Sequence, residues 1–187
     1  VFLWATSRLW GQANSKDNHL GLWLFAILMM ATIKETFVLL VGPVVLAILL
    51  FREPRQKMKM WIQTFRDETS QIQWLALGIV SFIGLFSAWM FNPHGLVDFV
   101  NAFLPWAKTG VKGAGHNKSF SYWFELCASA EPTALFAMGA LVAVAVHRSL
   151  RSKGRQNELV FWVIAGVSPF LFYSLIPYKT PWCLVSL

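Results

Sequence analysis

Two uncharged apolar runs, residues 20–33 and 37–51, flank a lysine and a glutamate that stand side by side, Lys34 and Glu35. Charged groups inside a bilayer cost about 2.5–3.5 kcal/mol each on insertion scales, so they usually face a water-filled cavity or a partner. At 14 and 15 residues, each run is short for a full crossing, which takes about 20 residues. We therefore predict two short helices that meet at a polar tip. The alternative, one kinked helix, would be about 48 Å long.

The composition places the whole chain in a bilayer. Its residues are 56% hydrophobic and only 13% charged, whereas soluble domains carry roughly 25% charged residues. We predict an all-α polytopic membrane protein with about five transmembrane helices in a single transmembrane domain, 1–187. The chain begins at Val1, and we expect it to be a fragment of a longer protein that lacks the N-terminal helices. The expected spans are 1–10 (in part), 20–33, 37–51, 74–91, 133–147 and 159–177, with an external segment at 92–132.

The basic residues assign the two faces of the membrane. The loops expected at 11–19, 52–73 and 148–158, taken with Arg8, hold 11 basic residues, whereas the alternate set holds 5. By the positive-inside rule the first set is cytoplasmic, and topology accounts for the net charge of +7 without a nucleic-acid partner. The non-cytoplasmic face then holds Lys34 and Glu35, the 92–132 segment, and residues 178–182.

The external segment contains most of the remaining polar candidates. Residues 96–106 are typical of a helix lying at the membrane interface, and 110–115, with three glycines, predict a flexible loop. Glu131 and Pro132 predict the start of a helix. A metal site could combine histidine with a carboxylate, but no pair has tight ligand spacing, so we predict neither a metal nor a cofactor and leave a divalent metal requirement open. The residues considered for it are His94, His116, Asp98 and Glu125.

The lysines have a simple interpretation and a functional one. In the simple interpretation, Lys34 and Glu35 merely neutralise each other. Lys179 then merely anchors a helix end at the interface, since it lies between Tyr178 and Trp182. Lysine also binds phosphate as a point charge. Apolar helices for a lipid tail, lysines for its head group and a carboxylate as base suit a lipid-linked phosphate substrate.

Three segments together resemble GT-C type integral-membrane glycosyltransferases. They are Ala31-Thr32-Ile33-Lys34-Glu35-Thr36, then Gly115-His116-Asn117-Lys118 with the following Tyr/Trp-rich run and Glu131-Pro132, and Tyr173-Ser174-Leu175-Ile176-Pro177-Tyr178-Lys179-Thr180-Pro181-Trp182. Within that class the chain is most similar to the flippase-activity-associated group, which is related to protein mannosyltransferases and to the lipid A aminoarabinose transferase.

This resemblance implies an enzyme that takes a sugar from a polyprenyl-phosphate donor on the non-cytoplasmic face, in a prokaryotic inner membrane. It implies that Lys34 and Lys179 contact the donor phosphate. The catalytic acid of the family follows the first spanning helix, so we expect it outside this fragment and leave the catalytic residue unassigned. Other candidate cavity residues are Glu35, His116, Lys118, Tyr122, Glu131 and Tyr178.

Two other classes remain open. A non-catalytic accessory subunit of a respiratory or photosynthetic membrane complex would use its many aromatic residues to pack against pigments, lipids or other membrane subunits. In that case His147 or His94 could ligate a chromophore. A transporter would use broken helices near the bilayer midplane, but the sequence has no internal repeat.

Overall fold

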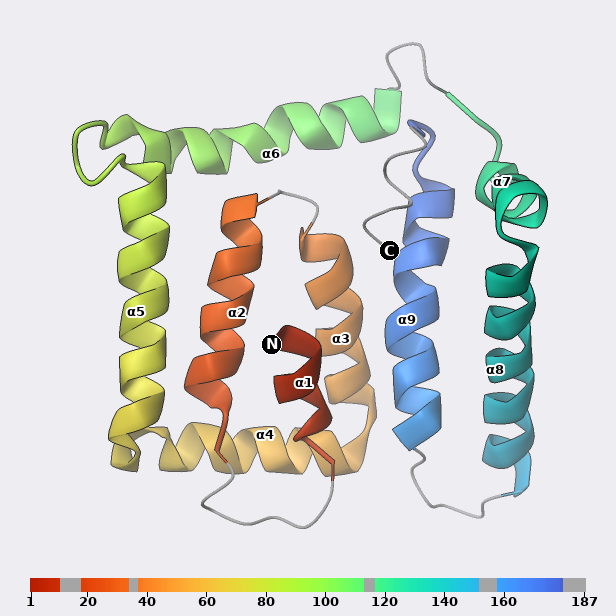
Figure 1. The fold of residues 1–187 in the computed structure, drawn as a ribbon, viewed down its shortest axis with the longest axis horizontal. Coiled ribbons are helices and arrows are strands. Elements are labelled where there is room, and N and C mark those ends of the chain that lie inside the picture. Colours follow the sequence, from red (N-terminus) through yellow and green to blue (C-terminus); the bar gives the residue numbers. More distant parts are fainter. Residues whose placement is uncertain (11–17, 34–36, 113–116, 152–157, 180–187) are drawn as a thin grey trace. The chain divides into compact units, whose positions relative to one another are not determined.

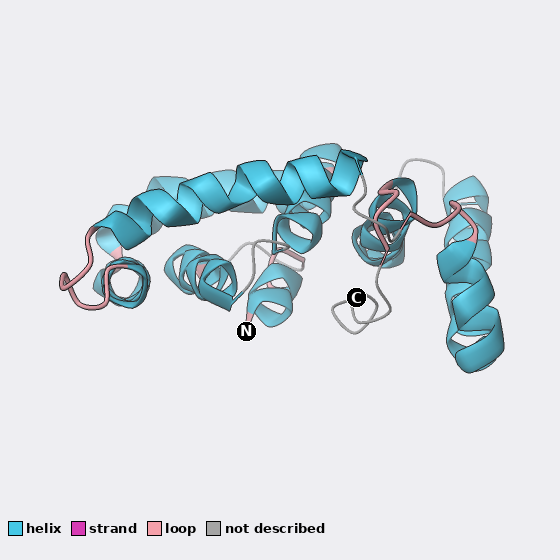
Figure 2. Cartoon of the chain, turned by 90° about the horizontal axis from the view of Figure 1, so that it is seen from above, coloured by secondary structure: helices cyan, strands magenta, loops and turns pink. Residues whose placement is uncertain are grey.

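The computed structural model describes residues 1–10, 18–33, 37–112, 117–151 and 158–179. Most of these residues are helical, and no strand is formed among them (Figures 1 and 2). Their contacts divide the chain into two compact units. Unit 1 comprises Val1–Val38 and Ile48–Leu104, and unit 2 comprises Leu39–Ala47 and Pro105–Leu187. The expectation of a single transmembrane domain stays a prediction.

Three helices of the described part are long and apolar enough to cross a membrane: α5 (Thr69–Phe86), α8 (Pro132–Arg151) and α9 (Glu158–Leu175). Two more apolar helices, α2 (Leu20–Ile33) and α3 (Val38–Leu50), have 14 and 13 residues. The fold is therefore that of a helical protein suited to a membrane, and the count of about five spans stays a prediction. The remaining helices are α1 (Phe2–Ser7), α4 (Arg52–Thr64), α6 (His94–Lys112) and α7 (Tyr122–Ala130).

Exposed apolar side chains on the long helices fit lipid rather than water. On α8, Phe136 is 78% exposed and Leu150 is 82% exposed, and on α5 Leu85 is 58% exposed. Soluble monomers rarely expose contiguous apolar patches larger than a few hundred Å². Hydrocarbon tails can cover such surfaces without penalty, so these helices are consistent with a position in the bilayer.

The two apolar runs on either side of Lys34 and Glu35 form separate helices. α2 ends at Ile33 and α3 begins at Val38, while Lys34 and Glu35 lie outside the described residues. Pro43 lies inside α3 without ending it. It lacks the N–H that would bond to the carbonyl four residues earlier.

Unit 1 is built on the packing of α2 against α5, which lie side by side in Figure 1. Gly21 allows the two backbones to approach, because a Cβ there would overlap the backbone carbonyl of Gln71. The N–H of Gly21 also donates to Oε1 of Gln71 at 3.1 Å. Farther along, Gly78 faces Phe25, and the rings of Phe25 and Trp74 lie 5.4 Å apart. Small residues at the contact let membrane helices pack closely.

The segment 52–73, which we predicted as a basic loop, is instead largely helical. It contains α4, a short 3-10 helix (Phe65–Asp67) and the beginning of α5. On α4 the buried residues Pro54, Lys57 and Trp61 recur at helical spacing, so one face packs inward. The buried Asn18 side chain binds the end of α4 through the carbonyl oxygen of Trp61 at 2.9 Å.

The span predicted at 74–91 is displaced toward the N-terminus, because α5 begins at Thr69 and ends at Phe86. The next residues form a tight turn in which Ala88, Trp89 and Met90 have φ of 49°, 56° and 73°. Left-handed backbone of this kind cannot continue a right-handed helix. The buried Ser87 stabilises the turn by accepting a hydrogen bond from the N–H of Met90 at 2.9 Å. The chain then enters α6, which begins before the interfacial helix expected at 96–106.

Unit 2 contains α7, α8 and α9, and its core is aromatic. Trp123 is fully buried, and Phe170 and Tyr173 pack with it. The spans predicted at 133–147 and 159–177 correspond to α8 and α9. Pro132 is the first residue of α8, and the carbonyl of Glu131 accepts hydrogen bonds from two N–H groups of its first turn. The helix start predicted at Glu131 and Pro132 is confirmed.

Candidate functional site

The end of α9 leaves backbone carbonyls that its own helix cannot satisfy. The last four carbonyls of any helix lack intrahelical partners. The carbonyl of Tyr173 would bond to the N–H of residue 177, but that residue is Pro177, which has none. In the structure the indole Nε1–H of Trp123 donates to this carbonyl at 3.2 Å. The sequence of the helix end therefore creates acceptors that other elements must fill.

The segment 117–118 pairs with the residues just beyond the end of α9. Asn117 forms an isolated antiparallel bridge with Tyr178, and the N–H of Lys118 donates to the carbonyl of Pro177 at 3.0 Å. Two segments that lie 61 residues apart in the sequence, at Lys118 and Lys179, are thus paired. We call this arrangement the α9-end site: Lys118, Tyr122, Trp123, Tyr178 and Lys179.

Lys179 is the most unusual residue of the α9-end site. Only 2% of its surface is exposed. Its Nζ donates to the carbonyl of Ile176 at 2.6 Å and makes a long contact of 3.5 Å with the carbonyl of Lys118. Within the described residues, Lys179 has no carboxylate partner. Two neutral dipoles offset only part of the cost of burying a charge.

The electrostatic result of this burial is a lysine whose charged form is disfavoured. Desolvation lowers the pKa of the Lys179 ammonium below the ordinary lysine value. An anion placed beside it would favour the charged form and raise the pKa again. An anion that reached Lys179 would therefore offset the cost of burying its charge, which has no carboxylate partner among the described residues.

This lowered pKa predicts how stability depends on pH. Between the folded pKa and the ordinary lysine value, the unfolded chain binds more protons at residue 179 than the folded one, so the free energy of unfolding should rise with pH across that window. Below the folded pKa the penalty is complete and constant. Thermal unfolding of the wild type and of Lys179→Met, measured from pH 7 to pH 11, checks this. The rise should be smaller in the variant, and equal slopes would contradict it.

Lys118 offers a second cation on the exposed side of the same segment. Its side chain is exposed, and its Nζ lies 5.8 Å from the centre of the Tyr122 ring, within reach of a cation–π interaction. Tyr178 is partly buried. An exposed lysine next to a buried one can receive a multiply charged group such as a phosphate.

The other predicted residues have different positions. Glu131 is exposed at the junction of α7 and α8. It does not belong to the α9-end site. Lys34, Glu35 and His116 lie outside the described residues, so the convergence of Lys34 on Lys179 stays a prediction. Within the described ranges, no group of three His, Cys, Asp or Glu residues could hold a metal ion. The metal alternative that involves His116 falls outside the described residues.

Sequence reasoning did not identify Trp123 as a member of this site. From the sequence, Trp123 appeared only as part of the Tyr/Trp-rich run that follows Lys118. The available signal was Pro177, which removes the partner of the Tyr173 carbonyl and requires a donor from elsewhere. Comparison of this chain with protein-family models, with curated proteins and with solved structures gives no match.

Proposed function

We propose that this chain binds the phosphate of a membrane-embedded polyprenyl-phosphate sugar donor and is part of a GT-C type glycosyltransferase. The observation that carries the proposal is the buried Lys179, which has no carboxylate partner among the described residues and lies beside the exposed Lys118. The site follows directly after α9, one of the helices long and apolar enough to cross a membrane. A lipid tail could therefore lie along apolar helices while its head group reaches the lysines.

The glycosyl-transfer step rests on the resemblance of three segments, two of which meet in the α9-end site. In such a reaction the acceptor attacks the anomeric carbon, the bond to the phosphate oxygen breaks, and the lipid phosphate leaves with the bonding electrons. Positive charge at the phosphate stabilises the negative charge that develops there. We assign Lys118 and Lys179 to this role, together with Lys34, and assign no residue as the base. The proposed location is a prokaryotic inner membrane, with the site at the non-cytoplasmic face.

Binding of a polyprenyl phosphate to the chain in phosphatidylcholine nanodiscs tests the proposal. A hydrogen bond to a charged group contributes about 1.5–3 kcal/mol. Lys118→Ala and Lys34→Ala should each weaken binding roughly ten- to a hundredfold, since a factor of ten corresponds to about 1.4 kcal/mol. Lys179→Met should do the same and keeps an unbranched side chain for packing. Binding can be measured by native mass spectrometry or by displacement of a fluorescent analogue.

Arg148→Ala is the matched control. Arg148 is an exposed cation in the last turn of α8, on the face that the positive-inside rule assigns to the cytoplasm. Its removal takes away one charge and should leave binding unchanged. If Arg148→Ala weakens binding as much as Lys118→Ala, the attraction is general electrostatics. If neither Lys118→Ala nor Lys179→Met weakens binding, the α9-end site has only a structural role and the proposal fails.

One observation favours the accessory-subunit alternative. A Cβ added at Gly139 of α8 would meet no atom within 4 Å, and this side of α8 is exposed. Small residues on an open helix face suit close packing with another membrane helix. A chain that binds no polyprenyl phosphate but purifies with a second membrane protein would favour this alternative.

A further inference from the structure

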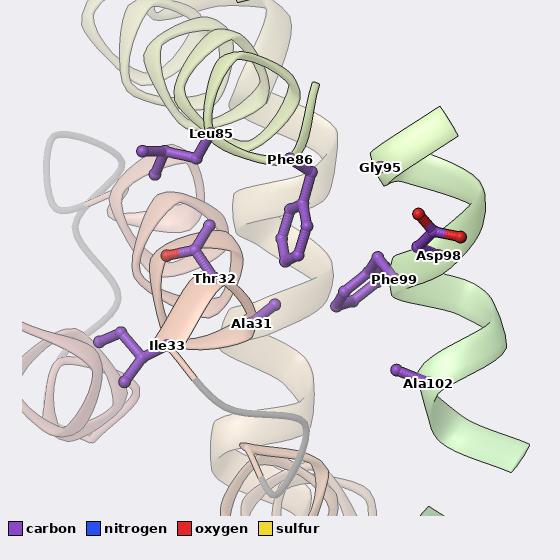
Figure 3. A pocket seen from close by; sticks show the side chains of 9 residues that line it. All are labelled: Ala31, Thr32, Ile33, Leu85, Phe86, Gly95, Asp98, Phe99 and Ala102. Carbon is purple, nitrogen blue, oxygen red and sulfur yellow. The ribbon is translucent and has the colours of Figure 1, made fainter. Parts of the chain in front are cut away.

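A pocket of 420 Å³ in unit 1 is independent of the α9-end site. Figure 3 shows it between the end of α2, the end of α5 and the beginning of α6. Its volume falls within the range of small-molecule sites, about 300–1,000 Å³. The lining side chains are mostly apolar: Ala31, Thr32, Ile33, Leu85, Phe86, Gly95, Asp98, Phe99 and Ala102.

The sequence builds this pocket from close packing around two phenylalanines. Phe86 and Phe99 point toward one another in Figure 3, with ring centres 4.6 Å apart. Gly95 lets α6 begin against the end of α5, because a Cβ there would overlap the carbonyl of Phe86. The result is an apolar wall held in place by backbone contact.

The polar side-chain groups of the pocket are acceptors. Asp98 supplies an exposed carboxylate that makes no hydrogen bond or ion pair within the described part of the chain. The hydroxyl of Thr32 uses its proton on the carbonyl of Met29 at 2.7 Å, which leaves its lone pairs free. The N–H of Gly95 is also used, because it donates to the carbonyl of Asn92 at 3.1 Å.

The helix ends at the pocket also favour a positively charged ligand. α2 and α5 both end at the pocket, at Ile33 and Phe86. The C-terminus of a helix carries the negative end of its dipole and favours cations. A ligand that fits this pocket therefore has a head group that donates hydrogen bonds and carries positive charge, joined to an apolar chain.

We infer that this pocket binds a membrane lipid whose head group carries a primary ammonium, with the ammonium at Asp98 and the apolar chain against Phe86 and Phe99. The apolar part of α5 ends at the pocket, so the ammonium would lie at the level of the lipid head groups. This inference does not depend on the transferase proposal, because none of its residues belongs to the α9-end site.

Photoaffinity labelling tests the inference. The probe is a long-chain primary alkylamine with a diazirine in its chain, applied to the chain in phosphatidylcholine nanodiscs, with the alcohol of equal length as the uncharged comparison. Labelled peptides are mapped by mass spectrometry. We expect saturable amine labelling of residues 20–33 and 94–112, about tenfold weaker in Asp98→Asn, as expected for loss of a charge-assisted contact. Nanodiscs containing phosphatidylethanolamine should compete with the amine probe.

Two further variants complete the test. Ala102→Phe places a ring in the pocket from an exposed position and should reduce labelling by both probes. Asp67→Asn removes an exposed carboxylate from the 3-10 helix and should change neither. Equal labelling by amine and alcohol, or labelling that Asp98→Asn leaves unchanged, would overturn the ammonium assignment. Equal amine labelling in nanodiscs with and without phosphatidylethanolamine would overturn the assignment of the lipid.

Discussion

Replacing Trp123 by alanine is expected to remove about 3–5 kcal/mol from the free energy of unfolding, the usual cost of a buried Trp-to-Ala change. Trp123 is fully buried in the core of unit 2 beside Phe170 and Tyr173. Its indole also occupies the Tyr173 carbonyl, which the proline at 177 leaves without a helical partner. The change therefore opens a cavity and leaves a buried acceptor unsatisfied.

Trp123→Phe separates these two contributions. Phenylalanine keeps most of the apolar ring but has no N–H, so the loss should fall to about 1–3 kcal/mol, the cost of an unsatisfied buried group. Unfolding by SDS titration from mixed micelles, followed by circular dichroism, measures both. Trp162→Ala is the control, because Trp162 is only partly buried and its indole donates within α9 to Glu158. Equal losses for Trp123→Ala and Trp162→Ala would contradict the assigned role.

Trp123→Ala should also affect the α9-end site. The indole of Trp123 ties α7 to the last turns of α9, and the segment just before α7 carries Lys118, whose backbone N–H bonds to the carbonyl of Pro177. Loss of the indole contact should weaken polyprenyl-phosphate binding even at temperatures where the chain stays folded. Unchanged binding in a destabilised but folded variant would show that the pairing of 117–118 with 177–178 does not depend on Trp123.

Gly21→Ala should destabilise unit 1 by about 1–3 kcal/mol, the usual range for overpacking. The new methyl group would overlap the backbone carbonyl of Gln71, and a backbone atom cannot rotate away as a flexible side chain can. α2 and α5 would have to separate, which also lengthens the bond between the Gly21 N–H and the Gln71 side chain. The same SDS titration measures the loss.

Gly166→Ala is the matched control for Gly21→Ala. Gly166 also lies inside an apolar helix, but a Cβ there meets nothing within 4 Å. Alanine is the better helix former by about 0.5–1 kcal/mol, so this variant should be as stable as the wild type or more so. If both variants destabilise equally, the close approach at Gly21 does not determine the packing of α2 on α5.

Much of the secondary structure follows from local pattern. The apolar runs predicted α2, α3, α8 and α9 because an uncharged stretch in a bilayer must satisfy its own backbone hydrogen bonds. Pro132 after Glu131 predicted the start of α8, since proline suits the first helical position. Boundaries were less predictable. α5 ends at Phe86 because Ala88, Trp89 and Met90 turn left-handed, and no glycine in that turn announces it.

The helix α4 shows a different limit. Its basic residues suggested a loop, because charge was interpreted only as a signal of topology. The spacing of Pro54, Lys57 and Trp61 was present in the sequence, but only packing against the rest of unit 1 buries that face. Helical spacing of a few apolar residues in a charged segment predicts a packed helix only when another part of the fold offers a surface against which that face can pack.

The residue pattern alone indicates a helical chain that is apolar enough for a membrane, and it places at position 177 a proline that cannot donate to the Tyr173 carbonyl within α9. Which groups bond at the end of α9 depends on the folded arrangement. Trp123 comes from 50 residues before its partner Tyr173 and Lys118 from 61 residues before Lys179, and Lys179 is buried with no counter-charge among the described residues. A backbone carbonyl that lacks a helical N–H can be recognised from the local sequence. The donor that bonds to it comes from a distant segment, which only the packing of the helices brings close.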